Sequence, residues 1–207
     1  MTRGVPTGTT LWSGPAEGAD RGTAMDERVT LRSRLDRSVQ DAPNGPAVAA
    51  VIEALAMASI NLADLIADGP LAGITGRHSG VNSDGDLQKD IDVAADEMMR
   101  HALRATPVAA ILSEEAELPE ILDAEAPLCV AIDPLDGSAN LENNISVGTI
   151  FSIRPRGNDV VSTFFEPGTA QRAAGFVVYG PQTTLVLALN ERVDIFILDR
   201  RAREFLL

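Results

Sequence analysis

The hydrophobic positions in the N-terminal part of the chain follow the spacing of amphipathic helices. In residues 46–67 apolar side chains recur three or four positions apart, and Pro46 suits a first helical turn, so this segment predicts a long helix. Residues 90–103 repeat the pattern, and their acidic first turn would complement the helix dipole. The intervening residues 69–86 hold five glycines and little periodicity, which predicts a long loop.

Short apolar runs dominate the rest of the chain and have the length of strands. The predicted strands are residues 108–112, 128–132, 148–153, 175–179, 184–189 and 193–198. The connections between the last of them are too short for helical crossovers, so these strands should form an antiparallel meander. The predicted fold class is therefore α+β, a layered helix/sheet arrangement with a mainly antiparallel sheet.

The two ends of the chain suggest its domain organisation. Residues 1–24 are rich in Gly, Thr, Pro and Ala without apolar periodicity, which predicts a flexible N-terminal extension. Residues 25–207 then form one domain. The chain stops at Leu207 directly after a strand pattern and a basic turn, so we expect it to be truncated from a longer protein.

Composition and charge exclude several classes of function. The chain has 17 Lys plus Arg against 30 Asp plus Glu, a net charge of −13, which disfavours binding to nucleic acid or anionic lipid. No apolar run approaches the roughly 18 residues of a membrane span, and the N-terminus lacks the pattern of a secretion signal. The single cysteine, Cys129, lies in an apolar run and is expected to be a buried strand thiol. These features predict a soluble cytoplasmic protein.

The sequence DPLDGS, directly after the strand predicted at 128–132, carries the first candidate chemistry. Pro134 cannot donate to a sheet ladder, so the chain is expected to leave the sheet there. A tight turn at Gly137 would let Asp133 and Asp136 converge on one point. The amides of the Gly-Ser pair, at the start of a following helix, could then face an anion. Carboxylates for a cation beside amides for a phosphate suit phosphoryl transfer.

A second acidic pair, Glu114 and Glu115, follows the strand predicted at 108–112 as Asp133 follows its own strand. Ligands gather at such strand ends when the strands are neighbours. Taken alone, the glutamates would be a solvated charge run and the aspartates a capped turn. Close carboxylates repel one another unless a cation lies between them, and Mg²⁺ prefers oxygen ligands. With only two histidines in the chain, a histidine-rich zinc site is disfavoured.

At this point the motifs resemble a known family. The run IDPLDGSANLENNISVGTIFSI (132–153) closely resembles the signature of class I fructose-1,6-bisphosphatases, and SEE (113–115) resembles their paired-glutamate motif. The segments SDGDLQKDIDVAADE (83–97) and EPGTAQRAAGFVVYGPQTTLVLA (166–188) are also similar to that family. The likeness covers about residues 46–207 in the right order.

The resemblance implies a cytoplasmic homo-oligomer, usually a tetramer, that hydrolyses the 1-phosphate of fructose 1,6-bisphosphate in gluconeogenesis or the Calvin cycle. Sedoheptulose 1,7-bisphosphate is a further candidate substrate. The implied cofactor is Mg²⁺, about two or three ions per site, with Mn²⁺ as an alternative. The implied fold is the N-terminal half of the layered sugar-phosphatase fold.

The resemblance also assigns roles to individual residues. The implied metal ligands are Asp92, Glu114, Glu115, Asp133, Asp136 and the backbone carbonyl of Leu135. Among them, Asp92 and Glu115 are the implied catalytic residues, which help to activate the attacking water. The implied phosphate-binding segment is Asp136, Gly137, Ser138 and Ala139. Asp86 falls in the loop that would close over the site.

Some features depart from the family pattern. Ala139 stands where a hydroxyl residue is common, and the N-terminal segment does not match the nucleotide-regulated arm of animal members. Family members also continue past the equivalent of Leu207 with a second domain, which supplies another metal-binding glutamate and most sugar contacts. Two alternatives therefore stay open, namely an inositol-monophosphatase-like sugar phosphatase and an inactive fragment. The runs SVGTIFSI and VVYG favour the fructose-bisphosphatase reading.

Overall fold

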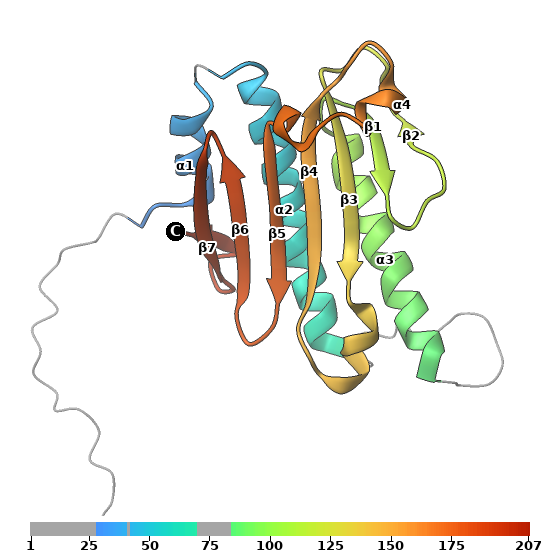
Figure 1. Ribbon diagram of the computed structural model, residues 1–207. Coiled ribbons are helices and arrows are strands. Elements are labelled where there is room, and N and C mark those ends of the chain that lie inside the picture. The colour runs from blue at the N-terminus through green and yellow to red at the C-terminus, as the bar shows by residue number, and fades with distance from the viewer. Residues whose placement is uncertain (1–27, 41, 70–83) are drawn as a thin grey trace, which may run out of the picture.

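The computed structural model describes residues 28–40, 42–69 and 84–207. A layer of helices lies against one face of a mixed sheet (Figure 1). The helices of this layer are α1 (Leu31–Ser38), α2 (Gly45–Asp68) and α3 (Asp84–Arg104). α1 begins where the Thr30 side chain accepts a hydrogen bond from the Ser33 amide at 3.1 Å, which caps the helix.

The sheet carries most of the remaining chain, with shorter helical segments between its strands. Its strands are β1 (Val108–Ser113), β2 (Glu120–Ile121), β3 (Leu128–Asp136), β4 (Val147–Pro155), β5 (Ala173–Tyr179), β6 (Thr183–Leu189), β7 (Arg192–Asp199) and β8 (Glu204–Leu206). Their order in the sheet is β2-β1-β3-β4-β5-β6-β7-β8. The short helical segments are η2 (Ser138–Asn143), α4 (Val160–Thr163) and η3 (Gly168–Ala170). β1 and β3 run parallel, whereas every other neighbouring pair is antiparallel.

This architecture confirms the α+β class, the mainly antiparallel sheet and the closing meander. The helix predicted over 46–67 is α2. The second helix was predicted to begin near Asp90, but α3 begins at Asp84, so the end of the predicted loop, including Asp86, is helical. The rest of that loop, over residues 70–83, and the predicted extension over residues 1–24 lie outside the described residues.

α2 is long and apolar enough to cross a membrane by length and composition alone, which corrects the sequence expectation that no segment approaches that size. Half of its most apolar window is buried inside the protein, however. Its buried side chains include Val51, Ile52, Leu55 and Leu62. Burial against α3 and the sheet explains its apolar character, since a core helix of a folded domain needs such a face.

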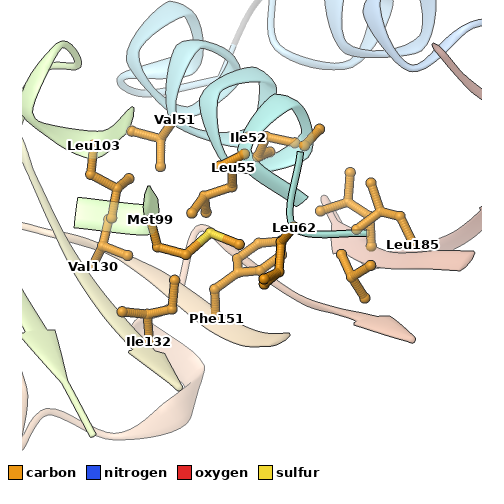
Figure 2. Close-up of a cluster of buried hydrophobic side chains, with 14 of the residues drawn as sticks. Val51, Ile52, Leu55, Leu62, Met99, Leu103, Val130, Ile132, Phe151 and Leu185 are labelled. Carbon is orange, nitrogen blue, oxygen red and sulfur yellow. The ribbon is translucent and has the colours of Figure 1, made fainter. Parts of the chain in front are cut away.

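The hydrophobic core lies between the helices and the sheet (Figure 2). Met99 and Leu103 of α3 are fully buried beside the α2 side chains, above Val130 and Phe151 of the sheet. Each such side chain contributes about 1.5–3 kcal/mol of transfer free energy on burial. Cys129 is buried as expected, in a smaller cluster on the sheet's other side.

The opposite face of the sheet exposes apolar side chains. In β7, Phe196 and Leu198 point to the core, while the alternating Val193, Ile195 and Ile197 are 65%, 57% and 46% exposed. A lateral row of paired residues runs across the strands from the acidic end of β3. This row is Asp133, Ile150, Phe176, Val186 and Ile195. We call the face defined by these residues, Val193 and Ile197 the open face.

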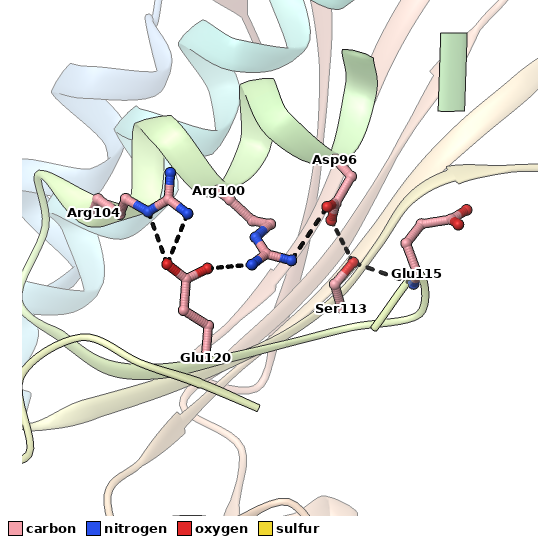
Figure 3. Close-up of polar contacts among 6 residues, drawn as sticks. All are labelled: Asp96, Arg100, Arg104, Ser113, Glu115 and Glu120. Carbon is pink, nitrogen blue, oxygen red and sulfur yellow. Dashed lines mark hydrogen bonds and ion pairs between the residues drawn. The ribbon is translucent and has the colours of Figure 1, made fainter. Parts of the chain in front are cut away.

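Ion pairs tie β2 to α3. Glu120 contacts Arg100 at 2.6 Å and Arg104 at 2.7 Å (Figure 3). Burial raises the pKa of Glu120, but the hydrogen bond from Arg104 and the charges of both arginines outweigh it and hold the pKa below its ordinary value. A carboxylate whose pKa is lowered by folding stabilises the folded state only while it is ionised.

Glu120→Gln should therefore destabilise the protein by about 1 kcal/mol at neutral pH, because the ion pairs are lost. The difference from wild type should persist above the ordinary pKa of 4.5 and disappear as the pH falls through the lower pKa of the folded state. Urea unfolding of both proteins across this pH range measures it. A difference that grew toward acidic pH would contradict the assignment.

Candidate functional site

The candidate site begins where two parallel strands end side by side. Ser113, the last residue of β1, is in register with Ile132 of β3, and the Glu114 amide donates to the Ile132 carbonyl at 2.9 Å. Glu114 and Glu115 therefore leave the sheet beside Asp133. The expectation that the two acidic pairs follow neighbouring strands is confirmed.

The local path of β3 differs from the prediction. The chain does not leave the sheet at Pro134, because β3 continues to Asp136. Asp133 pairs with Ile150 and Asp136 with Gly148, so β3 has one residue more than β4 over this stretch. This irregularity is a β-bulge, where a proline without an amide proton is tolerated.

A buried hydroxyl chain holds the bulge in place. Thr149 Oγ1 donates to the Pro134 carbonyl at 2.8 Å and lies 2.7 Å from the Tyr179 hydroxyl. A threonine hydroxyl has one proton, so Tyr179 must be the donor in the second bond. Burial, opposed by hydrogen bonds with Ser59 and Thr149, raises the pKa of Tyr179 to about 12, so its proton is retained at neutral pH.

Thr149→Val should destabilise the protein by about 2–4 kcal/mol, because the Pro134 carbonyl and the Tyr179 hydroxyl each lose a hydrogen-bond partner in a buried setting. Thermal or urea unfolding measures the loss.

Thr149→Ser is the matched control, since it keeps the hydroxyl and should cost only about 1 kcal/mol for the lost methyl group. Equal losses in the two variants would show that the hydroxyl chain is not what holds the bulge.

The turn after β3 is the glycine turn expected from the sequence. Gly137 has φ of 77°, a left-handed conformation that favours glycine, and its carbonyl accepts from the Asn140 amide at 2.8 Å. η2 starts directly afterwards with Ser138 and Ala139 in its first turn. Asp136, Gly137 and Ala139 are exposed, whereas Leu135 is buried. The predicted order of acidic strand end, glycine turn and helical start is confirmed.

α3 brings Asp92 to the same place. Ser138 Oγ donates to Asp92 Oδ2 at 3.1 Å, across 46 residues of sequence. The second oxygen, Oδ1, is buried and has no hydrogen-bond partner in the described part of the chain. A buried carboxylate oxygen without a partner costs free energy unless a cation or proton is supplied.

The electrostatics of the site show crowded negative charge. Burial raises the pKa of Asp92, and the negative charge of Glu114 adds to this effect. The hydrogen bond from Ser138 lowers the pKa but does not outweigh the other two. Burial and the charges of Asp92, Glu114 and neighbouring aspartates raise the pKa of Glu115. Burial and the charge of Asp136 raise the pKa of Asp133, against the hydrogen bond from the Leu135 amide at 3.2 Å. Each carboxylate thus disfavours ionisation of the others.

This donor set fits a hard divalent cation. It consists of carboxylates that repel one another and includes an unpartnered buried oxygen, and a cation relieves both penalties. As the side chains stand, no three acidic, histidine or cysteine residues among the described ones are grouped closely enough to enclose an ion. Binding would therefore require acidic side chains of the site to move closer together, and Glu114, Glu115 and Asp136 are exposed.

The structure also places residues that the sequence reasoning missed. Asp96, Ser113, Thr149 and Tyr179 contact or support the site; they lie inside the segments that resemble the family, but the sequence reasoning gave none of them a role. Asp96 could have been found, because it lies four residues after Asp92 and so shares its helix face. The side chains of Thr149 and Tyr179 come together only through strand pairing. Asp86 lies in the first turns of α3, and its side chain is outside the described set.

Comparison with known proteins places this fold and site in a family. Residues 30–207 match the family model described as fructose-1-6-bisphosphatase, N-terminal domain. The chain therefore belongs to the fructose-1,6-bisphosphatase family and corresponds to its N-terminal domain.

Several curated relatives and solved structures support the assignment. A class 1 fructose-1,6-bisphosphatase of Bradyrhizobium sp. (strain BTAi1) is 62% identical over 88% of this chain and 52% of its own length. One from Nitrobacter vulgaris is 53% identical over 87% of this chain and 53% of its own. The crystal structure of Leishmania major fructose-1,6-bisphosphatase in holo form superposes with a TM-score of 0.74 at 28% identity, covering 87% of this chain and 58% of that one. The chain thus spans about half the length of the curated relatives it matches.

Proposed function

We propose that this chain is the metal-binding half of a class 1 fructose-1,6-bisphosphatase that hydrolyses the 1-phosphate of fructose 1,6-bisphosphate. The observation that carries the proposal is the meeting of Asp92, the Glu114–Glu115 pair and the β3 bulge at one end of the sheet. Family membership and the relatives' names support the substrate. Sedoheptulose 1,7-bisphosphate is a second substrate candidate of the same chemistry.

The acidic residues have distinct roles in this proposal. The cation ligands are Glu114, Glu115, Asp92, Asp133, Asp136 and the Leu135 carbonyl. The chemistry that Mg²⁺ supplies when bound is stabilisation of phosphoryl charge and a more acidic attacking water. Asp92 and Glu115 would accept the proton of that water, since an ionised carboxylate held beside a water can act as its general base.

The turn after β3 would bind the phosphate. The amides that follow Asp136, at Gly137, Ser138 and Ala139, precede or open η2, and amides at such a turn can hydrogen-bond an anion. Ala139 has no hydroxyl, so it would contribute its backbone only. Asp136 would connect the phosphate segment to the cation.

The domain organisation is part of the proposal. The curated relatives extend over about twice the matched length, and we propose that a second, substrate-binding domain, as the resemblance implies, covers the open face. A concavity of about 780 Å³ on this face is lined by Phe176 and Val186 and reaches Glu114 and Asp133. The sugar contacts would then come from outside residues 25–207. We also propose a cytoplasmic homo-oligomer, a tetramer as in the resemblance.

The test uses this chain joined to the part of the Bradyrhizobium relative that follows the matched segment, hereafter the joined protein. Purified with Mg²⁺, it should release phosphate from fructose 1,6-bisphosphate, and EDTA should stop the release. Inositol monophosphate is the comparison substrate, since an inositol-monophosphatase-like enzyme is the alternative. A preference for inositol monophosphate would overturn the proposal.

A further inference from the structure

A hydrogen-bonded chain of side chains ends on the backbone of Glu115. Ser113, which is 3% exposed, accepts a hydrogen bond from the Glu115 amide at 3.3 Å through its Oγ. The same hydroxyl donates to Asp96 Oδ1 at 2.6 Å (Figure 3). Because a serine hydroxyl has a single proton, donating it to Asp96 leaves the oxygen lone pairs for the amide.

The chain continues through charged groups on α3 and β2. Asp96 Oδ2 accepts from Arg100 at 3.3 Å, and Arg100 contacts Glu120 at 2.6 Å. Arg104 pairs with the other oxygen of Glu120 at 2.7 Å. Two cations and two anions therefore alternate, so the negative charge of Asp96 is compensated and both of its oxygens are engaged.

The acidic residues of the proposed cation site are different in this respect. The acidic side chains at that site are Asp92, Glu114, Glu115, Asp133 and Asp136. None of the five makes an ion pair with another described residue. Asp96 lies close enough to raise the pKa of Glu115. Both of its carboxylate oxygens are already bonded, however, to Arg100 and Ser113, so Asp96 is not among the carboxylates available to a cation.

We infer that Asp96 and Ser113 are positioning residues for the paired glutamates. The Asp96–Ser113 hydrogen bond fixes the hydroxyl so that it accepts from the Glu115 amide, and this holds the backbone turn from which Glu114 and Glu115 project. Arg100 and Glu120 anchor Asp96 from the other side. Outer partners of this kind orient the residues that bind a metal. The inference rests on the proposed cation site.

The test is Mn²⁺ binding to the purified chain, followed by electron paramagnetic resonance of the free ion. Ser113→Ala and Asp96→Asn should each weaken Mn²⁺ binding about 10-fold or more. The double variant should bind about as weakly as either single variant, because both changes break the same chain. Thr163→Val is the matched control. Its buried hydroxyl also accepts from a backbone amide, that of Gly157 at 2.9 Å, but at the other end of the sheet.

The outcomes separate the two claims. If the folded wild-type chain binds no Mn²⁺, the proposed cation site fails and the inference fails with it. If wild type binds and both single variants bind equally well, only the positioning role is overturned. It is also overturned if Thr163→Val weakens binding as much as Ser113→Ala, since general destabilisation would then explain the loss.

Discussion

Asp133→Asn is expected to lower Mg²⁺-dependent phosphatase activity of the joined protein about 1000-fold, because a cation ligand contributes several kcal/mol of transition-state stabilisation. The same substitution should raise the thermal stability of the isolated chain in EDTA. Asp133 is half-buried, and burial together with the charge of Asp136 raises its pKa, so its ionised form costs stability at neutral pH. Loss of function with a gain in stability is the pattern of a functional charge cluster.

Glu166→Gln is the matched control for this experiment. Glu166 is an exposed carboxylate three residues after α4, and its backbone carbonyl accepts from Arg154, which pairs with Cys129 at the end of β3 away from the candidate site. Glu166→Gln removes the same unit of charge as Asp133→Asn and should leave both activity and melting temperature near those of wild type. Near-normal kcat in Asp133→Asn, or a melting temperature that falls in EDTA, would contradict the role given to Asp133.

The isolated chain is expected to hydrolyse fructose 1,6-bisphosphate at least about 1000-fold more slowly than the joined protein. In the proposed function its residues supply cation ligands and a phosphate segment, but substrate positioning contributes about 7–11 kcal/mol in favourable cases and would depend on sugar contacts from the proposed second domain. Side-by-side assays at equal Mg²⁺ measure the ratio. Robust turnover by the isolated chain would refute the proposal that the sugar contacts come from a second domain.

The open face offers a structural control for that comparison. Ile195→Lys, in the apolar row, should reduce activity and melting temperature of the joined protein, because a charge would be buried under the proposed second domain. It should leave the isolated chain as stable as before, since Ile195 is 57% exposed there. Leu118→Lys is the matched change, as Leu118 is 77% exposed in the connection after β1. Equal effects of the two changes would argue against a domain on the open face.

Sequence reasoning predicted the elements whose pattern is long and regular. The apolar spacing of α2 and the strand runs after residue 108 were enough for the layer and the meander. α1 was not predicted, because it has only 8 residues and buries just Leu31 and Leu35, which are too few positions to show a helical period. β2 and β8 are too short to stand out at all. Such elements exist because neighbouring strands and helices provide partners for them.

Within the site, local sequence reasoning was accurate for the glycine turn and less so for its supports. Pro134 was interpreted as a strand end because it lacks an amide proton. The bulge accommodates Pro134 instead, and a hydrogen bond from Thr149, a partner on another strand, holds it. The start of α3 was placed too late, because Gly85 and several polar residues hide its first turns from a hydrophobic pattern. Contacts between residues far apart in the sequence, such as that between Thr149 and the Pro134 carbonyl, cannot be predicted from a local sequence pattern.

If the ends of β1 and β3 and Asp92 of α3 form a divalent-cation site, the isolated chain should bind Mg²⁺. Isothermal titration of Mg²⁺ into the isolated chain tests it most directly, with Asp133→Asn and Glu166→Gln titrated in parallel. We expect saturable Mg²⁺ binding in wild type and in Glu166→Gln, and no binding in Asp133→Asn. Folded wild-type protein that shows no binding, or equal binding by Asp133→Asn, would contradict it.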